Sequence, residues 1–279
     1  MYRVVAAAPL SENVVRLEVQ APPIAAARKP GQFVIVRAGP EGERIPLTIA
    51  DVNVQAGTIT LVIQRVGKST ALLTALKAGD AIHDVAGPLG RPTHLEACAH
   101  AVCVGGGVGT AVVYPIAKAL AERGTTVTAV IGGRTKDLVI LETEMQALCR
   151  QVLVTTDDGS YGRKGFVTDA LADLLANAVP PVGVVYAVGP VPMMKAVSNL
   201  TRPAGIKTIV SLNPVMVDGT GMCGGCRVSV GGKTLFACVD GPEFDGHLVD
   251  FDELADRLTA YSIQEWHAKE KCKLNLPSE

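Results

Sequence analysis

Three cysteines and an aspartate lie close together in the last quarter of the chain. Asp218, Cys223, Cys226 and Cys238 follow the pattern D-x4-C-x2-C-x11-C. With a cysteine in the first place this would be the C-x4-C-x2-C…C spacing of a plant-type [2Fe–2S] cluster, whereas here a carboxylate stands there. Four glycines between Asp218 and Cys226 allow the backbone to fold around the sulfides and donate N–H groups to them. The spacing therefore predicts a metal site.

The fourth ligand of this site has rivals, because an aspartate followed by glycine is also typical of an ordinary turn. The other donors nearby are His247, His267 and Cys272. Three thiolates with one aspartate or histidine would also hold a structural zinc ion. The odd total of seven cysteines argues against complete disulfide pairing.

A second pattern lies in the middle of the chain, where residues 102–110 read VCVGGGVGT. An apolar strand runs directly into Gly105, Gly106, Gly107 and Gly109, and Thr110 opens a helix. Backbone N–H groups at such a junction can face a pyrophosphate. The spacing differs from G-x-G-x-x-G, and the acidic residue usual about 20 positions later is absent. A tight turn would also explain the glycines, but nucleotide binding is favoured.

Further candidate residues follow the ends of neighbouring strands. Arg134 could hold the 2′-phosphate of NADP, contact a ribose or diphosphate oxygen, or be solvated. Asp157 could serve a ribose, although its loop is also an ordinary turn. Gly189 and Pro190 follow another apolar strand, at the end where open parallel sheets bind ligands. We therefore expect these two residues on the nicotinamide side.

The first third of the chain has two polar signatures. Arg44, Pro46 and Thr48 lie in an extended segment that Pro46 makes typical of an edge strand. A later glycine turn leads into a helix and forms a second anion site, composed of Gly67, Lys68, Ser69 and Thr70. Two phosphate-binding loops suggest two nucleotides that meet, one of them a flavin.

The order of the elements predicts three domains. Short alternating strands with glycine and proline turns predict an antiparallel β-barrel over residues 1–96. Alternating strands and helices predict a parallel sheet over residues 97–206. Residues 207–279 are expected to form a small cluster domain, with a strand at 208–212, a hairpin at 226–238 and a helical tail at 253–268.

Composition excludes other classes. The 279 residues are 48% hydrophobic and 19% charged, with a formal net charge of −1. This charge balance does not favour electrostatic binding to nucleic acid or to an anionic membrane. We find no signal-peptide pattern and no apolar run near the ~20 residues of a membrane span, so we expect a cytoplasmic protein.

Together these motifs resemble one branch of the ferredoxin–NADP reductase superfamily. The resemblance covers essentially the whole chain and rests on RIPLT, VGKST, GPLG, GGGVGT, DDGSYGRKGFVTD, VGPVPMMK and DGTGMCGGC…C. The branch contains the electron-transfer subunit of dihydroorotate dehydrogenase B, the sulfide dehydrogenase small subunit and the small subunit of the bifurcating NADH-dependent reduced ferredoxin:NADP oxidoreductase. The aspartate in the first ligand position resembles the last of these.

The resemblance implies an enzyme subunit. Residues 44, 46, 48 and 67–70 would bind FAD, the glycine loop with residues 189–190 would bind NAD(H), and Asp218 with the three cysteines would hold a [2Fe–2S] cluster. NADP(H) stays open because of Arg134. The flavin would take a hydride from NADH and pass single electrons to the cluster, with no catalytic acid or base from this chain.

Electrons would leave to a larger partner that carries another flavin and [4Fe–4S] clusters. We expect this heterodimeric partner to dock near the C-terminal domain, with the tail around Trp266 as a candidate contact. Alternatives are the same subunit in a dihydroorotate or sulfide dehydrogenase, and a zinc-stabilised nucleotide-binding regulator.

Overall fold

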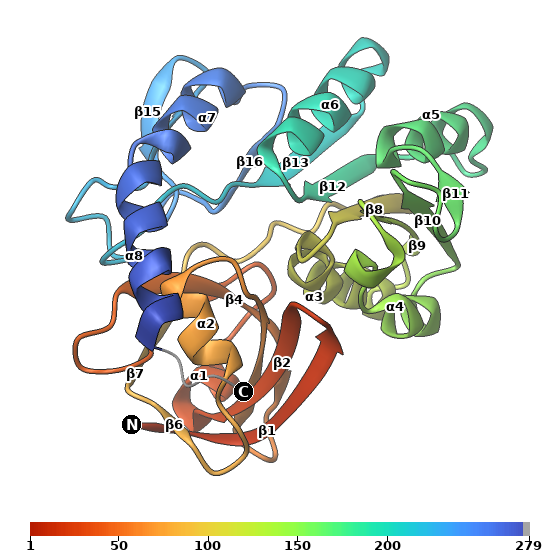
Figure 1. Cartoon of the computed structure of the whole chain (residues 1–279). Helices are drawn as coiled ribbons and strands as arrows, with labels where there is room; N and C mark the ends of the chain where they lie inside the picture. The colour runs from red at the N-terminus through yellow and green to blue at the C-terminus, as the bar shows by residue number, and fades with distance from the viewer. Residues whose placement is uncertain (276–279) are drawn as a thin grey trace.

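The computed structural model describes residues 1–275, and the chain forms three lobes (Figure 1). The first lobe is an antiparallel sheet in the order β6-β1-β2-β5-β4-β3-β7. Only His83 separates β6 from β7, so continuous chain joins the two ends of this row and the sheet curls into the predicted barrel. Its strands are β1 (Tyr2–Ser11), β2 (Val14–Gln20), β3 (Phe33–Arg37), β4 (Arg44–Asn53), β5 (Thr58–Gln64), β6 (Ala81–Ile82) and β7 (Asp84–Leu89).

Alternate residues along the barrel strands are apolar and point into the barrel. Leu17 and Val19 on β2 and Ile59, Leu61 and Ile63 on β5 are fully or almost fully buried in one apolar cluster. Successive side chains of a strand point to opposite faces, so this spacing places these side chains inside. Two short helices, α1 (Pro22–Ala27) and α2 (Lys68–Thr74), accompany the strands. The sequence predicted only the second of them.

The second lobe is a mostly parallel sheet in the order β11-β10-β9-β8-β12-β13-β16. Helices α3 and α4 pack on one face and α5 and α6 on the other. The strands are β8 (His100–Gly106), β9 (Thr126–Gly133), β10 (Gln151–Thr156), β11 (Arg163–Lys164), β12 (Val184–Val188), β13 (Lys207–Ser211) and β16 (Glu243–Asp245). The helices are α3 (Gly109–Glu122), α4 (Glu142–Leu148), α5 (Val167–Asn177) and α6 (Val191–Thr201), with short 3-10 turns at Lys136–Leu138 and Arg202–Ala204.

The strand order reverses at the centre of this sheet, although the central strands all run parallel. From β8 the chain continues to β9 on one side, and it returns later to β12 on the other side of β8. The carboxyl ends of β8 and β12 therefore form the switch point at which open α/β sheets bind their ligands.

The third lobe holds a hairpin of β14 (Arg227–Val230) and β15 (Lys233–Phe236), with helices α7 (Phe251–Thr259) and α8 (Ser262–Asn275). Residues 207–279 also contribute two strands to the sheet of the second lobe. Strand β13 runs parallel to β12, and β16 runs antiparallel to β13. The predicted tail at 253–268 is two helices rather than one. Helix α8 descends beside α2 of the barrel (Figure 1). The three-domain limits stay a prediction.

Contacts between the lobes fix their arrangement. Ala50 and Val62 of the barrel share an apolar cluster with Ala111 of α3. Lys118 on α3 forms an ion pair with Asp51 on β4, with an N–O distance of 2.9 Å. Helix α3, whose amino end follows the glycine loop, is thus held against the barrel. None of the helices within residues 1–275 has the length and apolar character that crossing a bilayer requires.

Candidate cofactor sites

The glycine loop lies at the carboxyl edge of the parallel sheet, as predicted. The Gly107 N–H donates to the Gly132 carbonyl, with an N–O distance of 2.7 Å. At the next strand end, the Asp157 N–H donates to the Gly133 carbonyl at 3.1 Å. The structure thus brings residues 105–110, the exposed Arg134 and the exposed Asp157 to one edge of the sheet.

The other glycine-bearing turn meets this loop at the switch point. A Cβ added to Gly109 would lie 2.2 Å from the Val188 carbonyl oxygen, and one added to Gly106 would lie 2.5 Å from the Met193 sulfur. A Cβ on Gly189 would also meet Met193. These glycines permit close packing of the β8–α3 and β12–α6 turns, which places Gly189 and Pro190 beside the loop.

Gly107 has a different role. It adopts a φ of +54°, in the left-handed region, and a Cβ there would find no atom within 4 Å. The loop therefore faces open space at Gly107. This space lies at the amino end of α3, where unpaired N–H groups favour an anionic ligand.

The predicted flavin segment on β4 has a free edge. Residues 44–48 pair only with β3, whereas pairing with β5 begins at Ile49. Pro46 lies opposite Ile35 in the register. The expectation of an edge strand therefore holds for the half of β4 that carries Arg44, Pro46 and Thr48.

The two predicted flavin segments lie next to each other. The Ser69 hydroxyl donates to the Glu43 carboxylate at an O–O distance of 3.0 Å, which connects the start of α2 with the residue before Arg44. Thr70 caps α2, because its Oγ1 accepts hydrogen bonds from the Val66 and Gly67 N–H groups. Gly67 and Lys68 stand at this same helix start.

The flavin segment also contacts the cysteine loop. Arg44 Nε donates to the Val217 carbonyl at 2.9 Å, and Nη2 donates to the Asp218 carbonyl at 3.5 Å. A residue of the barrel, predicted to bind flavin, thus holds the loop predicted to bind the cluster. These residues are more than 170 positions apart in the sequence.

The three cysteines gather in the third lobe. Cys226 and Cys238 are buried, with their sulfurs 3.2 Å apart, and the Cys238 N–H points to Cys226 Sγ at 3.5 Å. Cys223 is exposed, and its sulfur accepts a hydrogen bond from the Gly225 N–H at 3.4 Å. Burial, together with the Cys226 thiol, raises the pKa of Cys238 to about 12. A bound metal must therefore displace this proton.

Asp218 lies next to Cys223. One carboxylate oxygen accepts from the Thr220 N–H, and the other accepts from the Met222 and Cys223 N–H groups at 3.1 and 2.7 Å. These backbone hydrogen bonds, that of Thr220 first, hold the pKa of Asp218 below its usual range. The carboxylate is therefore ionised near neutral pH, the form in which it binds metal.

The four donors form two pairs, Asp218 with Cys223 and Cys226 with Cys238. The described residues contain no group of three or more His, Cys, Asp or Glu side chains placed to hold a metal ion. A two-iron cluster takes two protein ligands at each iron, so a set of two pairs fits it. The backbone N–H groups that already point at two of the sulfurs also fit such a cluster.

Two of the rival ligands have other partners. His247 Nε2 shares a hydrogen bond with the Thr201 hydroxyl at 3.0 Å. His267 contacts Trp266 on α8. The side chain of Cys272 lies outside the described residues. Among the described side chains of these candidates, Asp218 is the one that lies beside a cluster cysteine.

Three arginines around this loop were not singled out from the sequence. Arg91 Nε donates to the Val239 carbonyl at 3.0 Å, Arg227 Nη1 to the Gly224 carbonyl at 2.9 Å, and Arg257 Nη2 to the Gly225 carbonyl at 3.2 Å. With Arg44, an arginine binds a carbonyl at or next to each of the four predicted ligands. Arg227 directly follows Cys226, which was the available signal.

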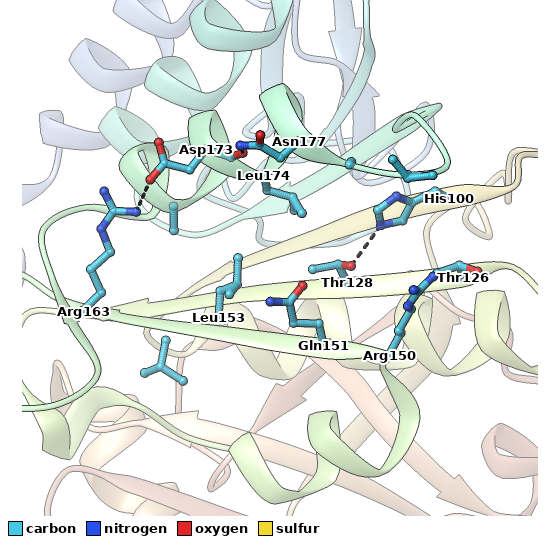
Figure 2. A pocket seen from close by; sticks show the side chains of 14 residues that line it. His100, Thr126, Thr128, Arg150, Gln151, Leu153, Arg163, Asp173, Leu174 and Asn177 are labelled. Carbon is cyan, nitrogen blue, oxygen red and sulfur yellow. Dashed lines mark hydrogen bonds and ion pairs between the residues drawn. The ribbon is translucent and has the colours of Figure 1, made fainter.

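A cavity of about 540 Å³ lies at the opposite end of the sheet, between α5 and the first residues of β9 and β10 (Figure 2). His100 lines it, and its two ring nitrogens already have partners in the Pro180 carbonyl and the Thr128 hydroxyl. Arg163 and Asp173, which also line the cavity, form an ion pair with an N–O distance of 2.6 Å (Figure 2). The cavity contains none of the predicted site residues.

Two segments of the chain match known protein families. Residues 103–199 match the family described as the oxidoreductase NAD-binding domain. Residues 213–250 match the family described as the iron-sulfur cluster binding domain of dihydroorotate dehydrogenase B. The first match covers the glycine loop, and the second covers Asp218 and the three cysteines.

Known relatives extend these matches over nearly the whole chain. A dihydroorotate dehydrogenase B (NAD(+)) electron transfer subunit homolog of Thermotoga maritima is 49% identical over 92% of this chain and 90% of its own. The dihydroorotate dehydrogenase B electron transfer subunit of Geobacillus thermodenitrificans is 36% identical over 84% of this chain and 92% of its own.

Solved structures agree. A chain from a study of flavin-based electron bifurcation in the NADH-dependent reduced ferredoxin-NADP oxidoreductase superposes with a TM-score of 0.92 and 46% identity, covering 97% of both chains. The ferredoxin reductase of carbazole 1,9a-dioxygenase superposes with a TM-score of 0.61 and 21% identity over 74% of this chain and 65% of its own, which shows the shared fold. The predicted barrel and parallel-sheet architecture is thereby confirmed.

Proposed function

This chain belongs to the family of dihydroorotate dehydrogenase B electron-transfer subunits, and we propose that it is the NADH-linked subunit of an electron-bifurcating ferredoxin:NADP transhydrogenase. FAD would supply hydride-to-electron conversion, and a [2Fe–2S] cluster would supply one-electron transfer to a larger subunit. The chain provides a nucleotide edge, a flavin segment and a cluster loop for these groups.

The contact that carries the proposal joins the flavin segment to the cluster loop. Arg44 lies on the free edge of β4 and holds the carbonyls of Val217 and Asp218. The nucleotide edge is fixed against the same barrel through α3 and the Asp51–Lys118 ion pair. Three sites on three lobes are thus held in one arrangement, as electron transfer between bound cofactors requires.

Each predicted residue has a binding role in this proposal. Residues 105–110 and 189–190 hold the pyridine nucleotide, with Arg134 and Asp157 beside its adenosine half. Residues 44–48 and 67–70 hold FAD, and Asp218 with the three cysteines holds the cluster. No side chain of this set would act as a general acid or base, because hydride transfer between a pyridine nucleotide and a flavin would need none.

Asp218 favours a transhydrogenase over the dihydroorotate alternative. It stands where the plant-type pattern has a cysteine, and its pairing with Cys223 suits a cluster ligand. The zinc-stabilised regulator is disfavoured by the match of residues 213–250 to an iron–sulfur domain and by the arrangement of the donors as two pairs. The six described cysteines are all free thiols, which suits a reducing compartment such as the cytoplasm.

The larger subunit, with its own flavin and [4Fe–4S] clusters, would dock at an exposed apolar rim beside the cluster loop. Val217, Met222 and Val239 are 49, 88 and 38% exposed, and each directly adjoins a predicted cluster ligand. Exposed apolar side chains that form a contiguous patch mark interaction surfaces. Docking here would shorten the electron path, because the partner would touch the loop that holds the cluster.

Replacing Met222 with glutamate is expected to weaken binding of the larger subunit by at least ~tenfold, about 1.4 kcal/mol. The buried carboxylate would lose hydration without gaining a partner. Val54→Glu, which changes an apolar side chain 61% exposed on the barrel, is the matched control. The affinities would be measured by isothermal titration with the isolated larger subunit, and equal values for the two variants would refute the docking face.

The cofactor content of the purified chain tests the function itself. Anaerobic purification is expected to give about one FAD with about two iron and two acid-labile sulfide per chain. Zinc in place of iron, with no flavin, would contradict the proposal and support the regulator.

A further inference from the structure

We propose that Arg227 and Arg257 are positioning residues that raise the reduction potential of the cluster through the backbone of its loop. This inference rests on the proposed function, since it concerns the [2Fe–2S] group. The two arginines lie on different elements, β14 and α7, and donate to consecutive carbonyls, those of Gly224 and Gly225. Both carbonyls lie between Cys223 and Cys226.

The first contact acts on one peptide group. Its carbonyl, on Gly224, accepts a hydrogen bond from Arg227 Nη1 at 2.9 Å. Its N–H, on Gly225, donates to the Cys223 sulfur at 3.4 Å. A cation on the carbonyl polarises the peptide and makes its N–H a stronger donor, because hydrogen bonds in a chain reinforce one another. Arg227 therefore strengthens the N–H···S bond to Cys223.

Gly224 is the residue that permits this contact. It adopts a φ of +66°, and a Cβ on it would lie 3.1 Å from Arg227 Nη1. A side chain at this position would strain the backbone and crowd the guanidinium. The glycine thus serves the approach of Arg227 as well as the turn.

The second contact comes from a helix with its own anchor. Phe251 and Leu254 of α7 are buried, and Arg257 extends from the same helix to the Gly225 carbonyl. Its Nε is buried without a hydrogen-bond partner. Among the ion pairs of the described residues, no carboxylate neutralises Arg227 or Arg257.

The positive charges of Arg227 and Arg257 affect the reduction potential of the cluster. A [2Fe–2S] cluster with three thiolates and one carboxylate is negative when oxidised and more negative when reduced. Nearby positive charge and N–H···S hydrogen bonds both favour the reduced form, which raises the potential. The planar guanidinium group also fixes the direction of its hydrogen bond to the carbonyl better than the ammonium group of a lysine would.

The test is a redox titration of the loaded cluster, followed by EPR at low temperature. Arg227→Gln is expected to lower the equilibrium constant for reduction about tenfold, which is ~59 mV for one electron. Arg227→Lys should recover part of this shift. Arg257→Gln should shift the potential in the same direction. Arg123→Gln, an exposed arginine at the end of α3, is the matched control and should leave it unchanged.

An unchanged potential in Arg227→Gln and Arg257→Gln would overturn the inference. If Arg227→Gln does not assemble a cluster, the test rests on the reduction potentials of Arg227→Lys and Arg257→Gln. Wild-type potentials in both of these variants would overturn the inference. A wild-type chain without any iron–sulfur signal would instead refute the proposed function, so the two failures are distinguishable.

Discussion

Replacing Cys226 with alanine is expected to abolish the iron–sulfur absorption and stop electron transfer to the larger subunit. Cys226 is buried and its sulfur lies 3.2 Å from that of Cys238, so its loss removes half of one donor pair. Loss of an outer-shell partner alone weakens metal binding ~10–100-fold, and the loss of a ligand must exceed this. Reduction of the bound flavin by NADH should continue, because the barrel and the nucleotide edge are unchanged. Visible spectra and iron analysis measure both effects.

Cys149→Ala is the matched control for this variant. Cys149 is half-buried between α4 and β10, where burial raises the pKa of its thiol to about 11 and keeps it protonated. Its removal should leave iron content and electron transfer intact. A full iron–sulfur spectrum in Cys226→Ala would contradict the ligand assignment.

Replacing Gly109 with alanine is expected to weaken NADH binding by at least ~tenfold, about 1.4 kcal/mol. The added Cβ would lie 2.2 Å from the Val188 carbonyl oxygen, a backbone atom that has no flexible end to yield. The amino end of α3 must therefore move away from β12, and the switch point opens. Fluorescence titration of NADH onto the flavin-loaded chain measures the change.

Gly39→Ala is the control for the glycine variant. Gly39 has an ordinary φ and no atom within 4 Å of an added Cβ, so alanine should be accepted there without effect. Unchanged NADH affinity in Gly109→Ala, with the fold intact by circular dichroism, would remove the glycine loop from the nucleotide site.

The helices and strands that position the sites could be predicted where apolar runs and glycine turns are distinct in the sequence. The apolar run before Gly105 predicted β8, and the glycines predicted a turn into α3. Helix α1 was missed because it is six residues long and no side chain caps it, so Pro22 suggested a turn.

At the cluster site, the ligands could be predicted from the sequence but the surrounding arginine contacts could not. The spacing of Cys223, Cys226 and Cys238 predicted a metal site, and the D-x4-C spacing put Asp218 among its ligands. The arginine contacts depend on tertiary structure, since Arg91 and Val239 are 148 positions apart. Likewise, only strand pairing shows that β13 and the antiparallel β16 complete the mostly parallel sheet.

An anaerobic titration of the purified chain with NADH, followed by visible absorption and EPR, tests the central claim most directly. NADH is expected to bleach the flavin bands and to give the EPR signal of a [2Fe–2S] cluster reduced by one electron, with a smaller response in Cys226→Ala that is confined to the flavin. A chain that carries flavin and iron but shows no absorbance change on addition of NADH would contradict it.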